Sequence, residues 1–187
     1  MILADMRPLL LALLALPLLA ADAPKPDASS KVAVKAKAKG KAPNPAMAPI
    51  EDVAGLPRVL LIGDSISIGY TLPVREALKG KANVHRPPGN CSSTGYTLSK
   101  VDAWLGTGKW DVIHFNFGIH DRATPIADYS KRLEELLERM EKTGAKIVWA
   151  STTPIPDDPA KKQSAASILE RNEAAQALMK KRGHVVN

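Results

Sequence analysis

Short apolar runs alternate along most of this chain with longer segments whose apolar positions recur every three or four residues. The short runs have the length of buried strands, and the periodic segments are typical of helices with one apolar face. Strands are predicted at 58–64, 82–86, 111–117, 146–151 and 184–187. Helices are predicted at 68–78, 96–105, 125–142 and 164–182.

This alternation of strands and helices predicts an α/β fold, with three αβα layers around a mostly parallel sheet. The domain is expected to cover residues 57–187, and its last strand stops at Asn187, so we expect a fold that is incomplete at the carboxyl terminus. In folds of this kind, ligands bind at the carboxyl ends of the strands. The loops after the first three predicted strands are therefore the places to look for chemistry.

The chain before residue 57 has a different composition. Residues 1–7 end in a basic residue, an apolar run follows, and small residues close it, which is the layout of a secretory signal peptide. The run is shorter than the roughly 20 residues of a membrane span, although an uncleaved anchor is the alternative. Residues 22–56 are rich in Ala, Pro and Lys and predict a disordered linker. We expect a signal peptide at 1–21 and a secreted or periplasmic protein without stable membrane insertion after signal removal.

The net charge of +7 does not indicate a nucleic-acid binder. Residues 22–50 hold six Lys and two Asp, whereas the charges of residues 51–187 nearly balance, and only 4% of the chain is aromatic. No cluster of His, Cys, Asp or Glu has metal-ligand spacing, so neither a metal nor a cofactor is expected. Cys91 is the single cysteine, which excludes an internal disulfide, and we interpret it as a half-buried structural residue rather than a reactive thiol.

Three loops at the carboxyl ends of predicted strands carry candidate chemistry. Residues 63–65 (GDS) place Ser65 between a strand and a helix, where it can act as a nucleophile with its N–H facing an oxyanion. Residues 89–95 (GNCSSTG) follow the second strand, and residues 118–121 (GIHD) follow the third. Each has an ordinary alternative: Ser65 as a helix cap, the second loop as a polar connection, and His120 as a cap of the next turn.

Together the three loops resemble the sequence blocks of the SGNH/GDSL hydrolase family. The first block of that family is a strand followed by Gly-Asp-Ser, matched here by LLIGDS, and the second carries an oxyanion-hole glycine, matched by Gly89. The third reads Gly-x-Asn-Asp, matched by residues 118–121 except that His120 stands where Asn is usual. The resemblance covers about residues 57–187. It implies a flavodoxin-like αβα fold and a serine esterase with Ser65 as nucleophile and Gly89 and His120 as oxyanion donors.

The chain departs from the family pattern in two places. His120 has one N–H when neutral and can serve an oxyanion in the right tautomer, and the stretch WDVIHFNFGIHD looks like a bacterial subgroup that uses His here. The family's fifth block, Asp-x-x-His, supplies the general base after the last strand, and this chain has no such block there. Asp111 precedes His114 at that spacing, but both fall in the third strand. We therefore expect the base and its Asp to lie beyond Asn187, and the 187-residue polypeptide to be inactive.

These features predict hydrolysis of carboxylic esters through an acyl-serine intermediate. The expected export favours a small-molecule or glycan ester as substrate, such as an O-acetyl group, although fold does not decide substrate. The alternative is a non-catalytic envelope- or carbohydrate-binding domain with a degenerate triad. An Asp-x-x-His block downstream in the gene favours the enzyme, and a stop codon after Asn187 favours the binding domain.

Overall fold

The structure, a computed structural model, describes residues 44–161 and 163–187. The predicted signal peptide and the linker up to residue 43 lie outside the described residues. The centre is a five-stranded sheet of order β2-β1-β3-β4-β5 in which every neighbouring pair is parallel. Its strands are β1 (Arg58–Ile62), β2 (Asn83–His85), β3 (Val112–Phe115), β4 (Lys146–Trp149) and β5 (Val185–Val186).

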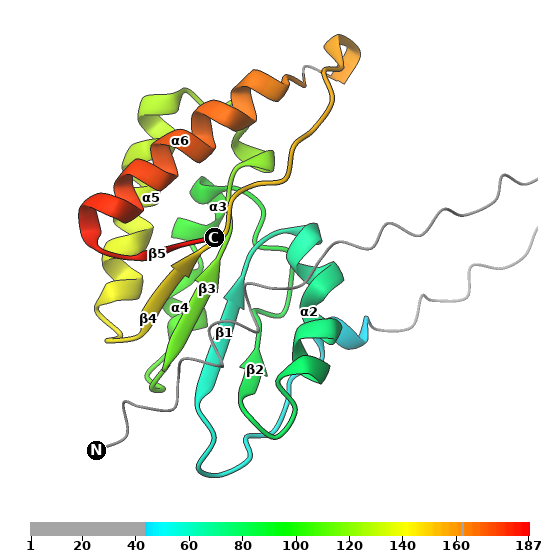
Figure 1. The fold of residues 1–187 in the computed structure, drawn as a ribbon, viewed down its shortest axis with the longest axis vertical. Helices are drawn as coiled ribbons and strands as arrows, with labels where there is room; N and C mark the ends of the chain where they lie inside the picture. The colour runs from blue at the N-terminus through cyan, green and yellow to red at the C-terminus, as the bar shows by residue number, and fades with distance from the viewer. Residues whose placement is uncertain (1–43, 162) are drawn as a thin grey trace, which may run out of the picture.

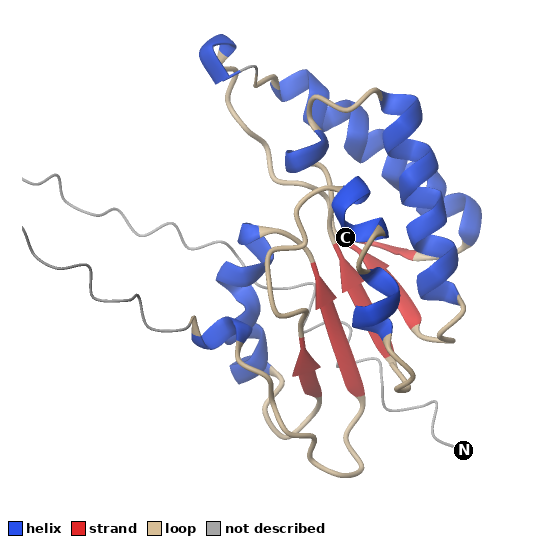
Figure 2. Ribbon diagram, turned by 180° about the vertical axis from the view of Figure 1, so that it is seen from behind, coloured by secondary structure: helices blue, strands red, loops and turns tan. Residues whose placement is uncertain are grey.

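Helices cover both faces of this sheet (Figure 1), so the predicted α/β fold with three αβα layers is confirmed. One face carries α2, and the opposite face carries the other α-helices, as the view from behind in Figure 2 also shows. The α-helices are α2 (Ser65–Ala77), α3 (Thr94–Leu98), α4 (Val101–Leu105), α5 (Ile126–Glu141) and α6 (Ala165–Arg182). Three short 3-10 helices are η1 (Pro45–Met47), η2 (Ile119–Asp121) and η3 (Pro159–Lys161).

Strands β1, β3, β4 and β5 each contribute to two separate cores, because their side chains alternate between the two faces. In β1, Val59 and Leu61 pack with α2, whereas Leu60 and Ile62 pack with the helices of the opposite face. A strand that is buried on both faces has no polar side, which is why VLLI, the buried part of β1 after Arg58, is an unbroken apolar run in the sequence. The larger core lies under α5, whose apolar stripe is fully buried.

Two predicted helices differ from the observed ones. Helix α2 begins at Ser65 rather than at residue 68, because the side chain of Asp64 caps it. The helix predicted at 96–105 is broken into α3 and α4. The Ser99 hydroxyl donates to the Tyr96 carbonyl at 2.8 Å, a local bond that competes with continued helix.

Residues 44–56, which composition assigned to the linker, lie against the domain in the structure. Arg75 of α2 donates to the carbonyl of Pro45 at 3.3 Å. The Asn83 side chain accepts from the Val53 N–H at 2.9 Å and donates to the Val53 carbonyl at 3.0 Å. Side chains of the domain therefore hold a segment for which the sequence predicted neither a helix nor a strand.

Candidate active site

The three candidate loops meet at the carboxyl ends of β1, β2 and β3, where the order of the sheet makes them neighbours (Figure 1). The first loop is central and contacts the other two. The N–H of Cys91 in the second loop donates to the Gly63 carbonyl at 3.2 Å. On the other side, Nε2 of His120 lies 4.0 Å from Oδ2 of Asp64. The structure therefore brings together the three sites that the sequence indicated.

Ser65 is the first residue of α2 and is exposed to solvent. The first N–H groups of a helix have no acceptor within the helix, and they form its electropositive end. Asp64 caps this end by accepting from the Ile66 N–H at 2.9 Å. A Cβ at Gly63 would lie 2.9 Å from the Cβ of Ser67, so a glycine is required for the turn to pack this tightly against the helix. The result is an open hydroxyl beside backbone N–H groups that can hold a negative charge.

The side chains of Asp64 and His120 approach each other across the loops that follow β1 and β3. The Asp64 carboxylate is 1% exposed, and its Oδ2 has no hydrogen-bond partner within the described residues. The 4.0 Å separation from His120 Nε2 is longer than a hydrogen bond. One carboxylate oxygen thus caps α2, and the other leaves a buried acceptor close to the imidazole.

The Gly89 loop is held in place by bonds within the loop and to α3. The Thr97 hydroxyl donates to the Cys91 carbonyl at 2.7 Å, and the Ser92 N–H donates to the Asn90 side chain at 2.8 Å. A Cβ at Gly89 would meet no protein atom within 4 Å. There is therefore open space beside the backbone of Gly89. A backbone group that is to contact a substrate needs such space.

Cys91 is fully buried under this loop rather than half-buried. Burial raises the pKa of its thiol to about 11. A thiol with such a pKa stays protonated at neutral pH, and the thiolate is the nucleophilic form. Cys91 is therefore a packing residue, as expected, and not a competing nucleophile.

The third loop is fixed by close packing and by a buried carboxylate. A Cβ at Gly118 would lie 2.2 Å from Oγ1 of Thr152, so only glycine fits at this position. Asp121 is fully buried and accepts from the N–H of Thr94 at 2.9 Å and from its hydroxyl at 2.7 Å. Asp121 thus ties the His120 loop to the start of α3.

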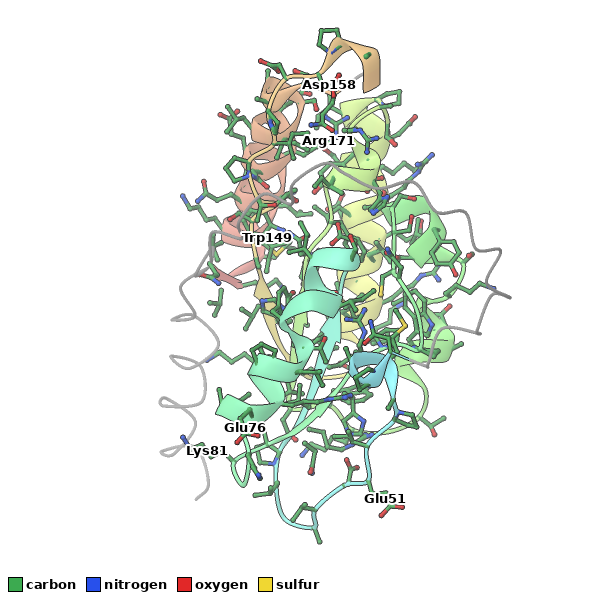
Figure 3. All side chains as sticks on the ribbon, turned by 90° about the vertical axis from the view of Figure 1, so that its right-hand side faces the viewer. Glu51, Glu76, Lys81, Trp149, Asp158 and Arg171 are labelled. Carbon is green, nitrogen blue, oxygen red and sulfur yellow. The ribbon has the colours of Figure 1, made fainter. Side chains whose placement is uncertain are left out.

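Arg171 of α6 holds the same loop from the other side. It is 3% exposed, and it donates to the carbonyl of Asp121 at 2.8 Å and to that of Thr124. Figure 3 shows Arg171 and Asp158 at one end of the molecule, opposite Glu76. Sequence reasoning did not assign Arg171 a role. The signal was available, since this charge occupies a position in the buried stripe of α6.

Of the four histidines, all within the described residues, only His120 lies in the loops around Ser65. His85 and His184 are each held at 2.6 Å by a carboxylate elsewhere, the first by an aspartate and the second by a glutamate. His114 lies inside β3, is 4% exposed, and packs edge-on against an aromatic ring. The interpretation of the Asp111–His114 spacing as a coincidence of the strand agrees with this burial.

The buried ring of His114 predicts a measurable loss of stability in acid. Burial lowers its pKa to about 4, whereas the unfolded chain takes up this proton near pH 6.5. The free energy of unfolding should therefore be unaffected by this group above about pH 6.5 and fall by about 3 kcal/mol as the pH drops towards 4. His114→Leu should remove this part of the acid sensitivity, measured by urea unfolding between pH 4 and 7. Equal pH slopes for the variant and the wild type would contradict the assignment.

No three His, Cys, Asp or Glu side chains in the part of the chain that the structure describes are grouped so as to hold a metal ion. No helix among residues 44–161 and 163–187 is both long and apolar enough to cross a membrane.

Comparison with known proteins gives matches only at the level of three-dimensional structure. No family model and no curated protein sequence matches the chain. A GDSL-like lipase from Bacteroides thetaiotaomicron VPI-5482 superposes with a TM-score of 0.62 at 16% identity, over 76% of this chain and 72% of that one. The acetyl xylan esterase AlAXEase gives a TM-score of 0.61 at 13% identity, over 69% of this chain and 75% of that one.

A third solved structure agrees with these two. The lipase/acylhydrolase from Enterococcus faecalis superposes with a TM-score of 0.60 at 17% identity, over 70% of this chain and 75% of that one. Identities this low establish the shared fold and nothing finer. The resemblance seen in the sequence is confirmed at that level: this chain has the SGNH/GDSL hydrolase fold.

Proposed function

We propose that this protein hydrolyses carboxylic esters through an acyl-serine intermediate. The observation that carries the proposal is the meeting of three loops around an exposed serine. Ser65 opens α2, the Gly89 loop is bonded to the carbonyl of Gly63, and His120 lies 4.0 Å from Asp64. The solved structures that share the fold include proteins described as a lipase and an acetyl xylan esterase, which supports the same class of reaction here.

In this mechanism Ser65 Oγ attacks the acyl carbon, and its proton passes to a general base. The N–H groups of Ser65 and Gly89, together with the His120 side chain, hold the oxyanion of the tetrahedral intermediate. The base then returns the proton to the leaving alcohol, and the acyl group remains on Ser65. Water, activated by the same base, releases the acid and restores the serine.

His120 is the one histidine of the chain that lies in the loops around Ser65. His85, His114 and His184 are held at other sites, so within these 187 residues only His120 could take the serine proton. In the pattern that the sequence resembles, the base comes from a separate Asp-x-x-His block and not from the loop that holds residue 120, so we propose that His120 is not the base. His120 then serves as an oxyanion donor.

For the substrate we propose a small ester or an O-acetyl group on a glycan outside the cytoplasm. The amino-terminal residues 1–21 have the layout of a signal peptide, which supports a secreted or periplasmic location. In that location ester groups on cell-envelope or plant polysaccharides are accessible. The acetyl xylan esterase among the structural matches supports the same class of substrate.

The proposal is tested with the purified full gene product on p-nitrophenyl acetate, butyrate and octanoate, and on acetylated xylan. We expect turnover of the acetyl ester, release of acetate from the polymer, and inhibition by a fluorophosphonate. Absence of both turnover and phosphonate labelling, with binding to the polysaccharide retained, would show that the protein is the non-catalytic binding domain.

A further inference from the structure

Arg86 is a buried cation directly after β2, at the base of the Gly89 loop, and the mechanism above does not use it. The residue is 9% exposed. An arginine has five N–H donors, and all five of its hydrogen bonds are made inside the protein. The acceptors, at 3.0 to 3.4 Å, are the carbonyls of Gly63, Pro87 and Gly89 and the hydroxyls of Ser67 and Thr71.

None of these five acceptors is a carboxylate. Burial lowers the pKa of Arg86, but an arginine keeps its charge in proteins. Burying a charge is unfavourable unless its hydrogen bonds are well made, and a hydrophobic residue fills the same space without that penalty. Packing alone therefore does not account for an arginine here. What distinguishes the guanidinium of Arg86 from a hydrophobic side chain is that one planar group binds several carbonyl oxygens at once.

Two of those carbonyls belong to the loops of the proposed oxyanion hole. Nη2 of Arg86 donates to the carbonyl of Gly63 at 3.4 Å and to that of Gly89 at 3.2 Å. The described peptide bonds are all trans, so fixing a carbonyl also fixes the N–H on the other side of the same peptide plane. One nitrogen thus fixes the Gly63–Asp64 and Gly89–Asn90 peptide planes. These two planes directly adjoin the peptides that carry the N–H groups of Ser65 and Gly89.

We propose that Arg86 is a positioning residue of the oxyanion hole, holding the backbone of Gly63 and Gly89 so that the N–H groups of Ser65 and Gly89 converge. This inference rests on the proposed esterase mechanism. The same guanidinium also bonds to Ser67 and Thr71 of α2 at 3.2 and 3.0 Å, so it sets the second loop relative to the helix that carries the nucleophile. Lysine cannot replace it, because an ammonium is a point charge with three donors and no planar fork.

The experiment compares Arg86→Lys and Arg86→Met with a control, Arg75→Met, in the full gene product. Arg75 also lies on this side of the sheet and also donates to three backbone carbonyls, those of Val84, Pro45 and Ala48, but away from the site. The readouts are kcat and KM for p-nitrophenyl acetate, the rate of phosphonate labelling of Ser65, and the melting temperature. Rates are measured well below each melting temperature and expressed per folded molecule.

We expect both Arg86 variants to lower kcat and the labelling rate by about 10- to 100-fold with KM little changed, since misplacement of catalytic groups costs rates of this order. Arg75→Met should lower the melting temperature comparably but leave kcat near that of the wild type. Near-normal kcat in folded Arg86→Lys would overturn the proposal, and so would failure of both Arg86 variants to fold, because Arg86 would then be a folding determinant only. A wild type without labelling or turnover refutes the esterase function itself, which separates the two failures.

Discussion

Replacing Ser65 with alanine is expected to abolish both ester hydrolysis and phosphonate labelling of the full gene product. The reason is that, among residues 44–161 and 163–187, no other hydroxyl or thiol combines exposure, a helix amino terminus and the neighbouring Gly89 loop. Loss of the nucleophile in a serine hydrolase removes about 10⁶ in turnover, because the remaining groups act only on a nucleophile that is present. The measurement is kcat on p-nitrophenyl acetate, with mass spectrometry to locate the phosphonate adduct.

This substitution should leave the fold intact. Ser65 is exposed, and the cap of α2 is supplied by Asp64, so we expect a change in stability within about 0.5 kcal/mol. Ser99→Ala is a matched control, since Ser99 is an exposed serine at the end of α3 whose hydroxyl bonds only to a local carbonyl. Labelling that persists in Ser65→Ala would point to another nucleophile and end the assignment.

The second large effect is expected at His120, where the chain departs from the family pattern. If His120 donates to the oxyanion, His120→Ala should lower kcat by about 10²- to 10³-fold with little change in KM, the loss seen when one such donor is removed. His120→Asn should recover part of the loss, because an amide can donate from a similar position. Both variants are measured for kcat, KM and melting temperature.

Two rival roles for His120 give different results. If it is a structural cap, the melting temperature falls and kcat per folded molecule stays normal. The hydrogen bonds that hold this loop run through the backbone and Asp121 rather than through the imidazole, which argues against this role. If His120 is the general base, His120→Asn is as inactive as Ser65→Ala, because an amide accepts no proton at neutral pH.

A matched histidine makes the comparison specific. His184 also lies near a carboxylate, with Nε2 at 2.6 Å from Glu141 Oε1, but it sits just before β5, away from Ser65. His184→Ala should lower stability and leave kcat near normal. Full kcat in His120→Ala would remove His120 from the oxyanion hole.

Much of this protein follows from the order of its residues alone. The unbroken apolar runs predict strands buried on both faces, and the alternation with periodic segments predicts the parallel three-layer fold that the structure has. The loop order along the chain and the residues GDS directly after the first strand place Ser65 at the mouth of that sheet. These features depend on neighbouring residues and on the periods of strand and helix, so they are visible without a fold.

Only the tertiary structure decides how buried polar groups are partnered. Arg171 reaches Asp121 across 50 residues, Asp121 reaches Thr94 across 27, and Arg86 reaches Gly63 across 23. No local pattern encodes such pairs, because each depends on which loops the sheet order makes adjacent. For the same reason, the sequence alone did not predict how residues 44–56 dock on the domain or where the four histidines lie. The sequence indicated which loops carry the chemistry, and the fold determined which charges hold those loops in place.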